Sequence, residues 1–200
     1  LNASPFENVK TDMRIMHAVS RMTETGLPFV YVNMVGGQDE LVFDGSSFAL
    51  NLGGKIASQM PSFSEGLSLL EVRSQSGTCH LTGQISRPAA AEEDVWRALT
   101  LGVRDYVEKN GFPGVILGLS GGVDSAIVAV LAVDALGPER VRVIMMPSDY
   151  TADISLADAE ELANNLGLTL ETIALRLGMD AFDSMLEASL KGTEMDATEE

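Results

Sequence analysis

A short glycine-rich segment carries the clearest chemical signal in the sequence. It reads Ser120-Gly121-Gly122-Val123-Asp124-Ser125, and it lies between the apolar run of residues 115–119 and a helical pattern. Adjacent glycines let a backbone approach a ligand closely and expose successive N–H groups, and the start of a helix adds the positive end of its dipole. The two serine hydroxyls are further donors. The segment therefore predicts a cradle for phosphate groups.

Asp124 is unusual in a phosphate-binding loop, because its negative charge would repel the anion. A cation between the two removes the conflict, and Mg²⁺ is commonly held by a carboxylate together with phosphate oxygens. We therefore expect Asp124 to be a ligand of Mg²⁺.

Two other nucleotide-binding motifs do not match this segment. A Walker loop ends in Gly-Lys-Ser/Thr, whereas the only lysine after Gly111 is Lys191. A dinucleotide fingerprint requires G-x-G-x-x-G, and the glycine spacing here differs. A turn without a ligand stays as the structural alternative, which six specified residues between a strand and a helix disfavour.

The elements around the loop alternate between apolar runs and helical patterns. Strands are predicted over residues 115–119, 141–146 and 168–175, and helices over 124–136, 155–165 and 180–190. Ser155 with Asp158 three residues later predicts a capping box at the start of the second of these helices. Such alternation is typical of a doubly wound parallel sheet, which binds ligands at the carboxyl ends of its strands. About half of such a sheet would be present.

The first ninety residues predict a different arrangement. A helix over residues 7–25 carries Val9, Met13, Met16, Val19 and Met22, which we interpret as a stripe that faces the core. Short strands are predicted over residues 29–35, 40–43, 47–52 and 67–72. Residues 74–91 are rich in Ser, Gly, Thr, Gln and Ala and predict a linker. A helix follows from about residue 92 and ends near Gly111.

Composition limits the possible partners. There are 29 acidic against 13 basic residues, a formal net charge of -16, and no basic stripe of the kind that binds nucleic acid. No apolar run approaches the roughly 20 residues that cross a membrane. Cys79 is the only cysteine, and we interpret it as incidental. We expect a cytoplasmic protein with no nucleic-acid or membrane partner, and the ends at Leu1 and Glu200 suggest an internal fragment.

The loop resembles the pyrophosphate loop of the N-type ATP pyrophosphatases. This group includes NAD, GMP, asparagine and argininosuccinate synthetases and tRNA-thiolating enzymes, and the resemblance implies that ATP is cleaved between its α and β phosphates. Within the group, residues 143–148, 155–159 and 162–163 are most similar to NAD synthetase.

The N-terminal half resembles nitrilase-type glutaminase domains. The resemblance lies in residues 1–6, 24–28, 31–33 and 35–45. A nitrilase-like tail joined to a pyrophosphatase loop is the arrangement of the glutamine-dependent NAD synthetases. The resemblance implies an α/β fold: the C-terminal part of a nitrilase-like domain over residues 1–73, a linker over 74–91, and over 92–200 the N-terminal part of a doubly wound, adenine nucleotide alpha hydrolase-like domain.

The resemblance also implies a reaction, that of a carbon–nitrogen ligase with glutamine as amido donor. ATP adenylates deamido-NAD, and ammonia from glutamine displaces AMP to give NAD. The glutaminase Glu, Lys and Cys would precede Leu1, so no catalytic residue falls within the chain, which we expect to be inactive alone. The full-length protein is expected to be a homo-oligomer.

By the same resemblance, specific residues receive roles. Ser4 and Lys10 would hold glutamine, and Asp124 would hold Mg²⁺. Asp149 departs from the basic or small polar residue common after Met-Pro-Ser, which puts a nucleotide contact there in doubt. The expected ATP contacts are Gly118, Leu119, Ser120, Gly121, Gly122, Val123, Asp124, Ser125 and Met146.

Three alternatives stay open at the level of sequence. A GMP synthetase would carry a Cys-His-Glu glutaminase, whose motifs are absent from this sequence. A tRNA-thiolating enzyme would need catalytic cysteines and a basic surface. A non-catalytic nucleotide-binding module would be favoured by a degenerate loop, whereas every specified position of this loop is intact.

Overall fold

The computed structural model describes residues 3–8, 10–75 and 77–190. The predicted segments at residues 1–2 and 191–200, and Val9 of the predicted stripe, lie outside the described residues. The chain divides into two compact units, Leu1–Pro113 and Gly114–Glu200. Each unit is described by itself below.

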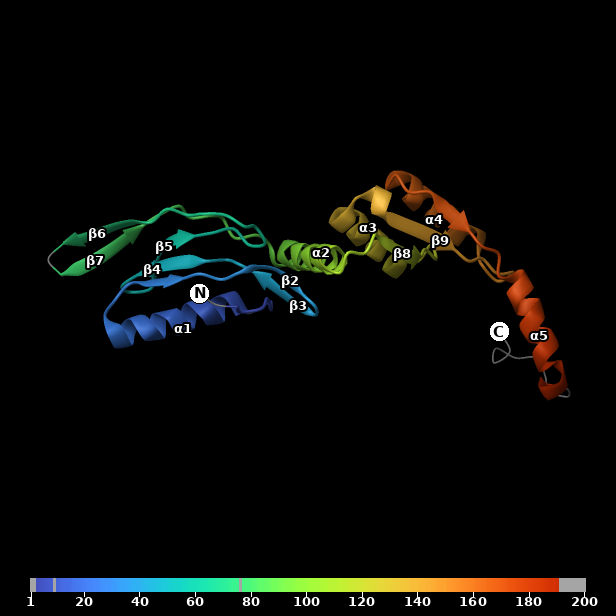
Figure 1. Ribbon diagram of the computed structural model, residues 1–200, viewed down its shortest axis with the longest axis horizontal. Helices are drawn as coiled ribbons and strands as arrows, with labels where there is room; N and C mark the ends of the chain where they lie inside the picture. The colour runs from blue at the N-terminus through green and yellow to red at the C-terminus, as the bar shows by residue number, and fades with distance from the viewer. Residues whose placement is uncertain (1–2, 9, 76, 191–200) are drawn as a thin grey trace. The chain divides into compact units, whose positions relative to one another are not determined.

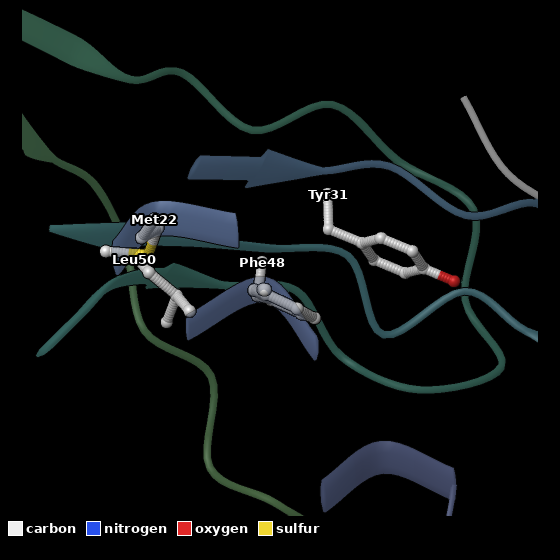
Figure 2. Packing of buried hydrophobic residues seen from close by; sticks show 5 residues of the cluster. Met22, Tyr31, Phe48 and Leu50 are labelled. Atoms are coloured by element: carbon white, nitrogen blue, oxygen red, sulfur yellow. The ribbon is translucent and has the colours of Figure 1, made fainter. Parts of the chain in front are cut away.

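The first unit is built on an antiparallel sheet with the strand order β1-β4-β5. Its strands are β1 (Phe29–Tyr31), β4 (Phe48–Asn51) and β5 (Lys55–Gln59), and helix α1 (Lys10–Thr25) packs on one face (Figure 1). Figure 2 shows Met22 of α1 beside Leu50 and Phe48, with Tyr31 nearby. The rings of Tyr31 and Phe48 are stacked with their centroids 5.0 Å apart. This cluster is the hydrophobic core between the helix and the sheet.

The buried face of α1 differs from the predicted stripe. Met13 and Met16 are 47% and 70% exposed, whereas Arg14, Ala18 and Met22 are buried. The prediction is confirmed for Met22, and Val19 packs against the same core, but it was wrong for Met13 and Met16. Residues 13, 16, 19 and 22 are spaced by three and drift around a helix of 3.6 residues per turn, so they do not all share one face.

Two hairpins and a helix complete the first unit. Strands β2 (Val35–Gln38) and β3 (Leu41–Asp44) form one hairpin, and β6 (Glu71–Gln75) and β7 (Thr78–Thr82) form the other. Helix α2 (Ala91–Lys109) packs against β2 and β3. Strand β7 therefore lies within the segment that the sequence predicts to be a linker, and the compact units divide after Pro113. The assignment of the predicted domains stays a prediction.

The second unit contains a parallel sheet with the order β10-β9-β8. Its strands are β8 (Val115–Gly118), β9 (Val141–Met145) and β10 (Leu170–Thr172), and Val143 at its centre is fully buried. Its helices are α3 (Val123–Leu136), the short 3-10 helix η1 (Pro138–Arg140), α4 (Asp153–Asn165) and α5 (Arg176–Leu190). The predicted α/β alternation with parallel pairing is confirmed.

The start of α4 corrects the predicted capping box. The helix begins at Asp153, and its N-cap is Ala152, which makes no side-chain cap. Ser155 therefore lies in the first turn, where its carbonyl oxygen approaches the glycine-rich loop. Among the described residues, no helix has the length and apolarity needed to cross a bilayer.

Candidate functional site

The glycine-rich segment forms the tight turn between β8 and α3. Leu119 is buried, and its N–H donates to the carbonyl oxygen of Ile144 in β9 at 2.9 Å. Gly121 has a φ of +80°, and a Cβ atom there would lie 2.2 Å from the carbonyl oxygen of Ser155. Any side chain at this position would therefore both strain the backbone and collide with α4.

The serine hydroxyls hold the loop in shape. The N–H of Ser120 donates to Ser125 Oγ at 3.2 Å, and the two hydroxyl oxygens are 3.0 Å apart. Ser125 Oγ donates to the carbonyl oxygen of Gly122 at 3.0 Å, while the Gly122 N–H donates to Ser120 Oγ at 3.3 Å. The loop is thus preorganised by its own hydrogen bonds.

The N-terminus of α3 is open to a ligand. Gly122 is the N-cap and makes no side-chain cap, so the first-turn N–H groups have no side chain to satisfy them. The positive end of the helix dipole adds to their attraction for an anion. Backbone groups of Val123 to Ser125 are therefore suited to phosphate oxygens.

A cavity of about 210 Å³ lies at the carboxyl ends of β8 and β9. Its walls combine main-chain atoms of the loop with apolar side chains, and they include four of the predicted ATP contacts. The lining residues are Gly118, Leu119, Ser120, Ile144, Met145, Met146 and Thr151. The remaining predicted contacts, Gly121 to Ser125, follow directly along the loop and do not line this cavity.

Thr151 was not found by sequence reasoning. Its hydroxyl accepts the N–H of Ser148 at 2.9 Å, and its own N–H donates to the Ser148 carbonyl at 3.1 Å. The signal was the Ser148-to-Thr151 spacing directly after a strand, which is typical of a turn closed by a hydroxyl group. This turn shapes the cavity wall beside β9.

Asp124 is exposed on the first turn of α3. No group of three or more His, Cys, Asp or Glu side chains that could hold a metal occurs in the part of the chain that the structure describes. The donor set here therefore fits a cation that takes one protein carboxylate and completes its shell with phosphate oxygens and water, as Mg²⁺ does.

Asp149 is paired with Arg176 at the start of α5. The guanidinium contacts Asp149 and also lies 2.9 Å from the carboxylate of Asp180. The hydrogen bond and charge of Asp149, followed by the charge of Asp180, raise the pKa of Arg176 above its ordinary value. The unexpected aspartate thus has a cationic partner within the second unit.

The predicted glutamine contacts, Ser4 and Lys10, lie in the first unit. Lys10 Nζ is 2.5 Å from Glu7 Oε1. Ser4 Oγ accepts from Arg14 Nε at 3.0 Å, and the Ser4 carbonyl accepts from Arg14 Nη2 and Asn33 Nδ2 at 2.9 and 3.0 Å. The segment that carries Ser4 is thereby fixed to α1 and to the loop after β1, and a role in glutamine binding stays a prediction.

Sequence reasoning missed the ion pair beneath Ser4. Arg14 Nη1 is 2.8 Å from Asp44 Oδ2, and both side chains are less than a tenth exposed. Buried arginine and aspartate residues are rare unless they are paired. The partners are 30 residues apart and belong to different elements, so the sequence around one residue gives no indication of the other.

The parallel sheet, the glycine-rich turn and the cavity at its carboxyl edge define an open α/β protein with a glycine-rich strand–helix turn. A family model described as NAD synthase matches residues 95–199, which is more than half of the chain. The chain belongs to the NAD synthase family.

Several relatives match all or nearly all of the chain. Glutamine-dependent NAD(+) synthetase from Rhodobacter capsulatus is 44% identical over 200 residues, covering all of this chain and 36% of the relative. The protein of the same name from Synechocystis is 48% identical over 191 residues, covering 93% of this chain and 33% of the relative. The chain thus spans about a third of the length of these curated relatives, 36% of the first and 33% of the second.

Solved structures give the same result. The glutamine-dependent NAD+ synthetase from Acinetobacter baumannii, solved in complex with ADP, is 41% identical, with a TM-score of 0.90 over all of this chain and 38% of that chain. A synthetase from Cytophaga hutchinsonii is 18% identical with a TM-score of 0.75 over 94% of this chain and 37% of that one, which shows the fold alone.

Proposed function

We propose that the protein containing this chain is a glutamine-dependent NAD synthetase. In the proposed reaction, the carboxylate of deamido-NAD attacks the α-phosphate of ATP, and pyrophosphate leaves. Ammonia released from glutamine then attacks the acyl adenylate, so that NAD and AMP are formed. Membership of the NAD synthase family and the names of the relatives that match all or nearly all of the chain support this proposal.

The observation that most supports this function is the preorganised loop beside the cavity at the carboxyl edge of the sheet. The N–H groups at the start of α3 would bind triphosphate oxygens, and Ser120 and Ser125 would keep the loop rigid. Leu119 and Met146 offer apolar surface in the cavity for the adenine ring. The relative from Acinetobacter baumannii was solved in complex with ADP, which supports nucleotide binding by the proposed protein.

Residues of this chain would act by position and charge. The loop would hold the α-phosphate in a fixed orientation, which lowers the entropic part of the barrier. The helix N-terminus would stabilise negative charge on the phosphates. Asp124 would hold Mg²⁺, which neutralises charge that develops on the leaving pyrophosphate.

The predicted domains complete the proposal. Residues 1–73 would belong to the nitrilase-like glutaminase domain and residues 92–200 to the synthetase domain, with Ser4 and Lys10 holding glutamine. The Glu, Lys and Cys of the glutaminase would lie in segments outside this chain. The cytoplasmic location, the homo-oligomeric state and the lack of a nucleic-acid partner stay predictions.

The test uses the full-length protein with ATP, Mg²⁺, glutamine and deamido-NAD, and it measures NAD, AMP and pyrophosphate by chromatography. Asp124→Asn removes one charge from the loop, and Glu160→Gln removes one from the exposed surface of α4 as a matched control. We expect Asp124→Asn to lower NAD formation by about 100-fold, because an amide is a weaker ligand than a carboxylate for the Mg²⁺ proposed at the reacting phosphates, and the control to be unaffected.

Two results would contradict the proposal in different ways. If ATP is cleaved to AMP only when another carboxylate or carbonyl acceptor is supplied, the loop chemistry stands and the substrate is wrong. If Asp124→Asn is as active as Glu160→Gln, the metal role of Asp124 is wrong.

A further inference from the structure

The main chain around Ser4 is held by groups from other parts of the first unit. The Asn33 amide makes two hydrogen bonds to it: Oδ1 accepts the Ser4 N–H at 2.9 Å, and Nδ2 donates to the Ser4 carbonyl at 3.0 Å. The Phe6 N–H donates to the Val42 carbonyl in β3 at 2.7 Å, and the Phe6 ring packs edge-on against Phe63 with 5.2 Å between the centroids. The backbone at Ser4 therefore follows a fixed path.

Arg14 of α1 holds the side chain of Ser4. Its Nε donates to Ser4 Oγ at 3.0 Å, and its Nη2 donates to the carbonyl oxygens of Ser4 and Pro5 at 2.9 and 3.0 Å. Its Nη1 donates to Asp44 Oδ2 at 2.8 Å. A guanidinium offers five N–H groups in a planar fork, so these bonds use most of them. Because the Arg14 side chain is also only 7% exposed, it is not placed to bind a substrate itself.

Asp44 fixes the orientation of this guanidinium. Its carboxylate is nearly inaccessible, and its Oδ1 also accepts from Asn33 Nδ2 at 3.5 Å. Turning the Arg14 fork away would leave two buried charges unpaired, which is costly in the interior of a protein. The plane of the guanidinium, and with it the direction of the bond to Ser4 Oγ, is therefore set by the ion pair with Asp44.

The hydroxyl of Ser4 keeps its proton for another partner. A hydroxyl oxygen can accept two hydrogen bonds and donate one. Ser4 Oγ accepts from Arg14, and within residues 3–8, 10–75 and 77–190 no group accepts from Ser4 Oγ. The charge of Arg14 makes the hydroxyl a stronger donor, because consecutive hydrogen bonds polarise one another. Ser4 is partly exposed, whereas Asn33 and Asp44 are buried, so the polarised donor is the accessible end of this network.

We propose that Arg14 is a positioning residue of the glutamine site, which orients the Ser4 hydroxyl so that its proton is donated to an oxygen of the bound glutamine. This inference rests on the proposed function, in which Ser4 contacts glutamine. The carboxylate and the side-chain carbonyl of glutamine both offer such an oxygen, whereas its α-ammonium group has no acceptor for this proton. Arg14 acts on the substrate only through Ser4, and Asp44 and Asn33 keep the two residues in place.

The test measures NAD formation by the full-length protein from glutamine and, separately, from an ammonium salt. Ser4→Ala removes the hydroxyl and leaves the main-chain bonds of Ser4 and the Arg14–Asp44 pair intact. Arg14→Lys keeps a positive charge for Asp44 but replaces the planar fork by a single ammonium group, which cannot make the same set of bonds. Arg21→Lys makes the same change at an exposed arginine of α1 and is the matched control.

We expect Ser4→Ala to raise the KM for glutamine about tenfold, as the loss of one hydrogen bond to a charged group does. The kcat at saturating glutamine should not change, because the contact contributes to binding in the ground state and the transition state alike. Arg14→Lys should have a similar effect on KM. The double variant should also stay near tenfold, because Arg14 acts through the hydroxyl that Ser4→Ala removes. Formation of NAD from ammonia should be unchanged in all variants, and Arg21→Lys should change neither KM nor kcat.

Four results would overturn the inference, each for a different reason. An unchanged KM in Ser4→Ala would show that the hydroxyl does not bind glutamine, whether or not Arg14→Lys folds. A fall in kcat with both nitrogen sources in Arg14→Lys, with no rise in KM, would show a structural role only. A rise of about 100-fold in the double variant, the product of the single effects, would show that Arg14 acts independently of Ser4. If the unmodified protein makes NAD from neither nitrogen source, the proposed function fails, and this inference fails with it.

Discussion

At the scale of single residues, Gly121 shows that the loop requires a residue without a side chain. Its φ of +80° lies in the region that side chains rarely adopt, and the Ser155 carbonyl occupies the space where a Cβ atom would stand. The loop can therefore lie against α4 only with glycine at this position. Ser120 and Ser125 then fix the remaining turn by hydrogen bonding to each other and to Gly122.

Comparing Gly121→Ala with a control glycine should separate the cost of backbone strain from the cost of a steric clash. In the same unit Gly167 has a φ of +70° with nothing within 4 Å of a Cβ atom, so Gly167→Ala is a matched control for strain alone. Both substitutions should cost about 1–2 kcal/mol of stability from the left-handed backbone. Gly121→Ala must also displace main-chain atoms, and we expect it to weaken binding of a non-hydrolysable ATP analogue to the full-length protein about 100-fold. Calorimetric titration that finds equal affinity in the two variants would contradict this account of the loop.

At the scale of elements, the sequence predicted the second unit better than the first. Largely apolar runs predicted β8 and β9 almost to the residue, although Ile116 of β8 and Arg142 of β9 are exposed, so the two strands are not covered on both faces as such runs suggest. The hairpin of β6 and β7 was missed in part, since residues 71–74 of β6 are all exposed and the alternation in β7 is limited to two inward residues, Cys79 and Leu81. Part of it was therefore interpreted as a linker.

The orientation of α1 could not be predicted from the sequence, because it depends on contacts between segments that are far apart in the chain. The burial of Arg14 depends on Asp44 in β3, a partner that only the tertiary structure supplies. The phosphate-binding loop, by contrast, was visible because its six residues are contiguous. The contact between the Gly37 N–H and Asp105 joins segments 68 residues apart, which no local pattern encodes, whereas Thr151 could have been found from its spacing to Ser148.

The Arg14–Asp44 pair, which joins α1 to β3, should contribute more to stability than a surface pair of the same helix. Arg14→Met leaves the nearly inaccessible Asp44 without its counter-charge, and we expect a loss of about 3–5 kcal/mol. Arg21→Met breaks the exposed pair with Glu24, for which we expect less than about 1 kcal/mol. Amide hydrogen exchange of the full-length protein, followed in peptides that cover α1, measures both opening free energies. Similar protection in the two variants would show that the buried pair does not hold the helix.

At the scale of the whole molecule, the chain presents large apolar side chains to solvent in both units. Leu67 and Leu69 precede β6 and are almost fully exposed, and Leu177 and Met185 of α5 are also exposed. Where such groups form a contiguous patch, they mark a surface that other protein normally covers. The net charge of -16 adds repulsion, which opposes compaction of the isolated chain.

We therefore expect the 200-residue chain expressed alone to be less stable than the same residues within the full-length protein. It should bind a hydrophobic dye strongly and be cleaved rapidly in limited proteolysis, because uncovered apolar surface and few covering contacts favour local unfolding. Screening by added salt should slow the cleavage, since it weakens the repulsion between acidic side chains. The full-length protein, digested under the same conditions and followed through peptides of this region, is the control. A sharp melting transition of the isolated chain together with resistance to the protease would contradict this prediction. It would show that the two units fold stably without the rest of the protein and that the exposed leucines do not destabilise them.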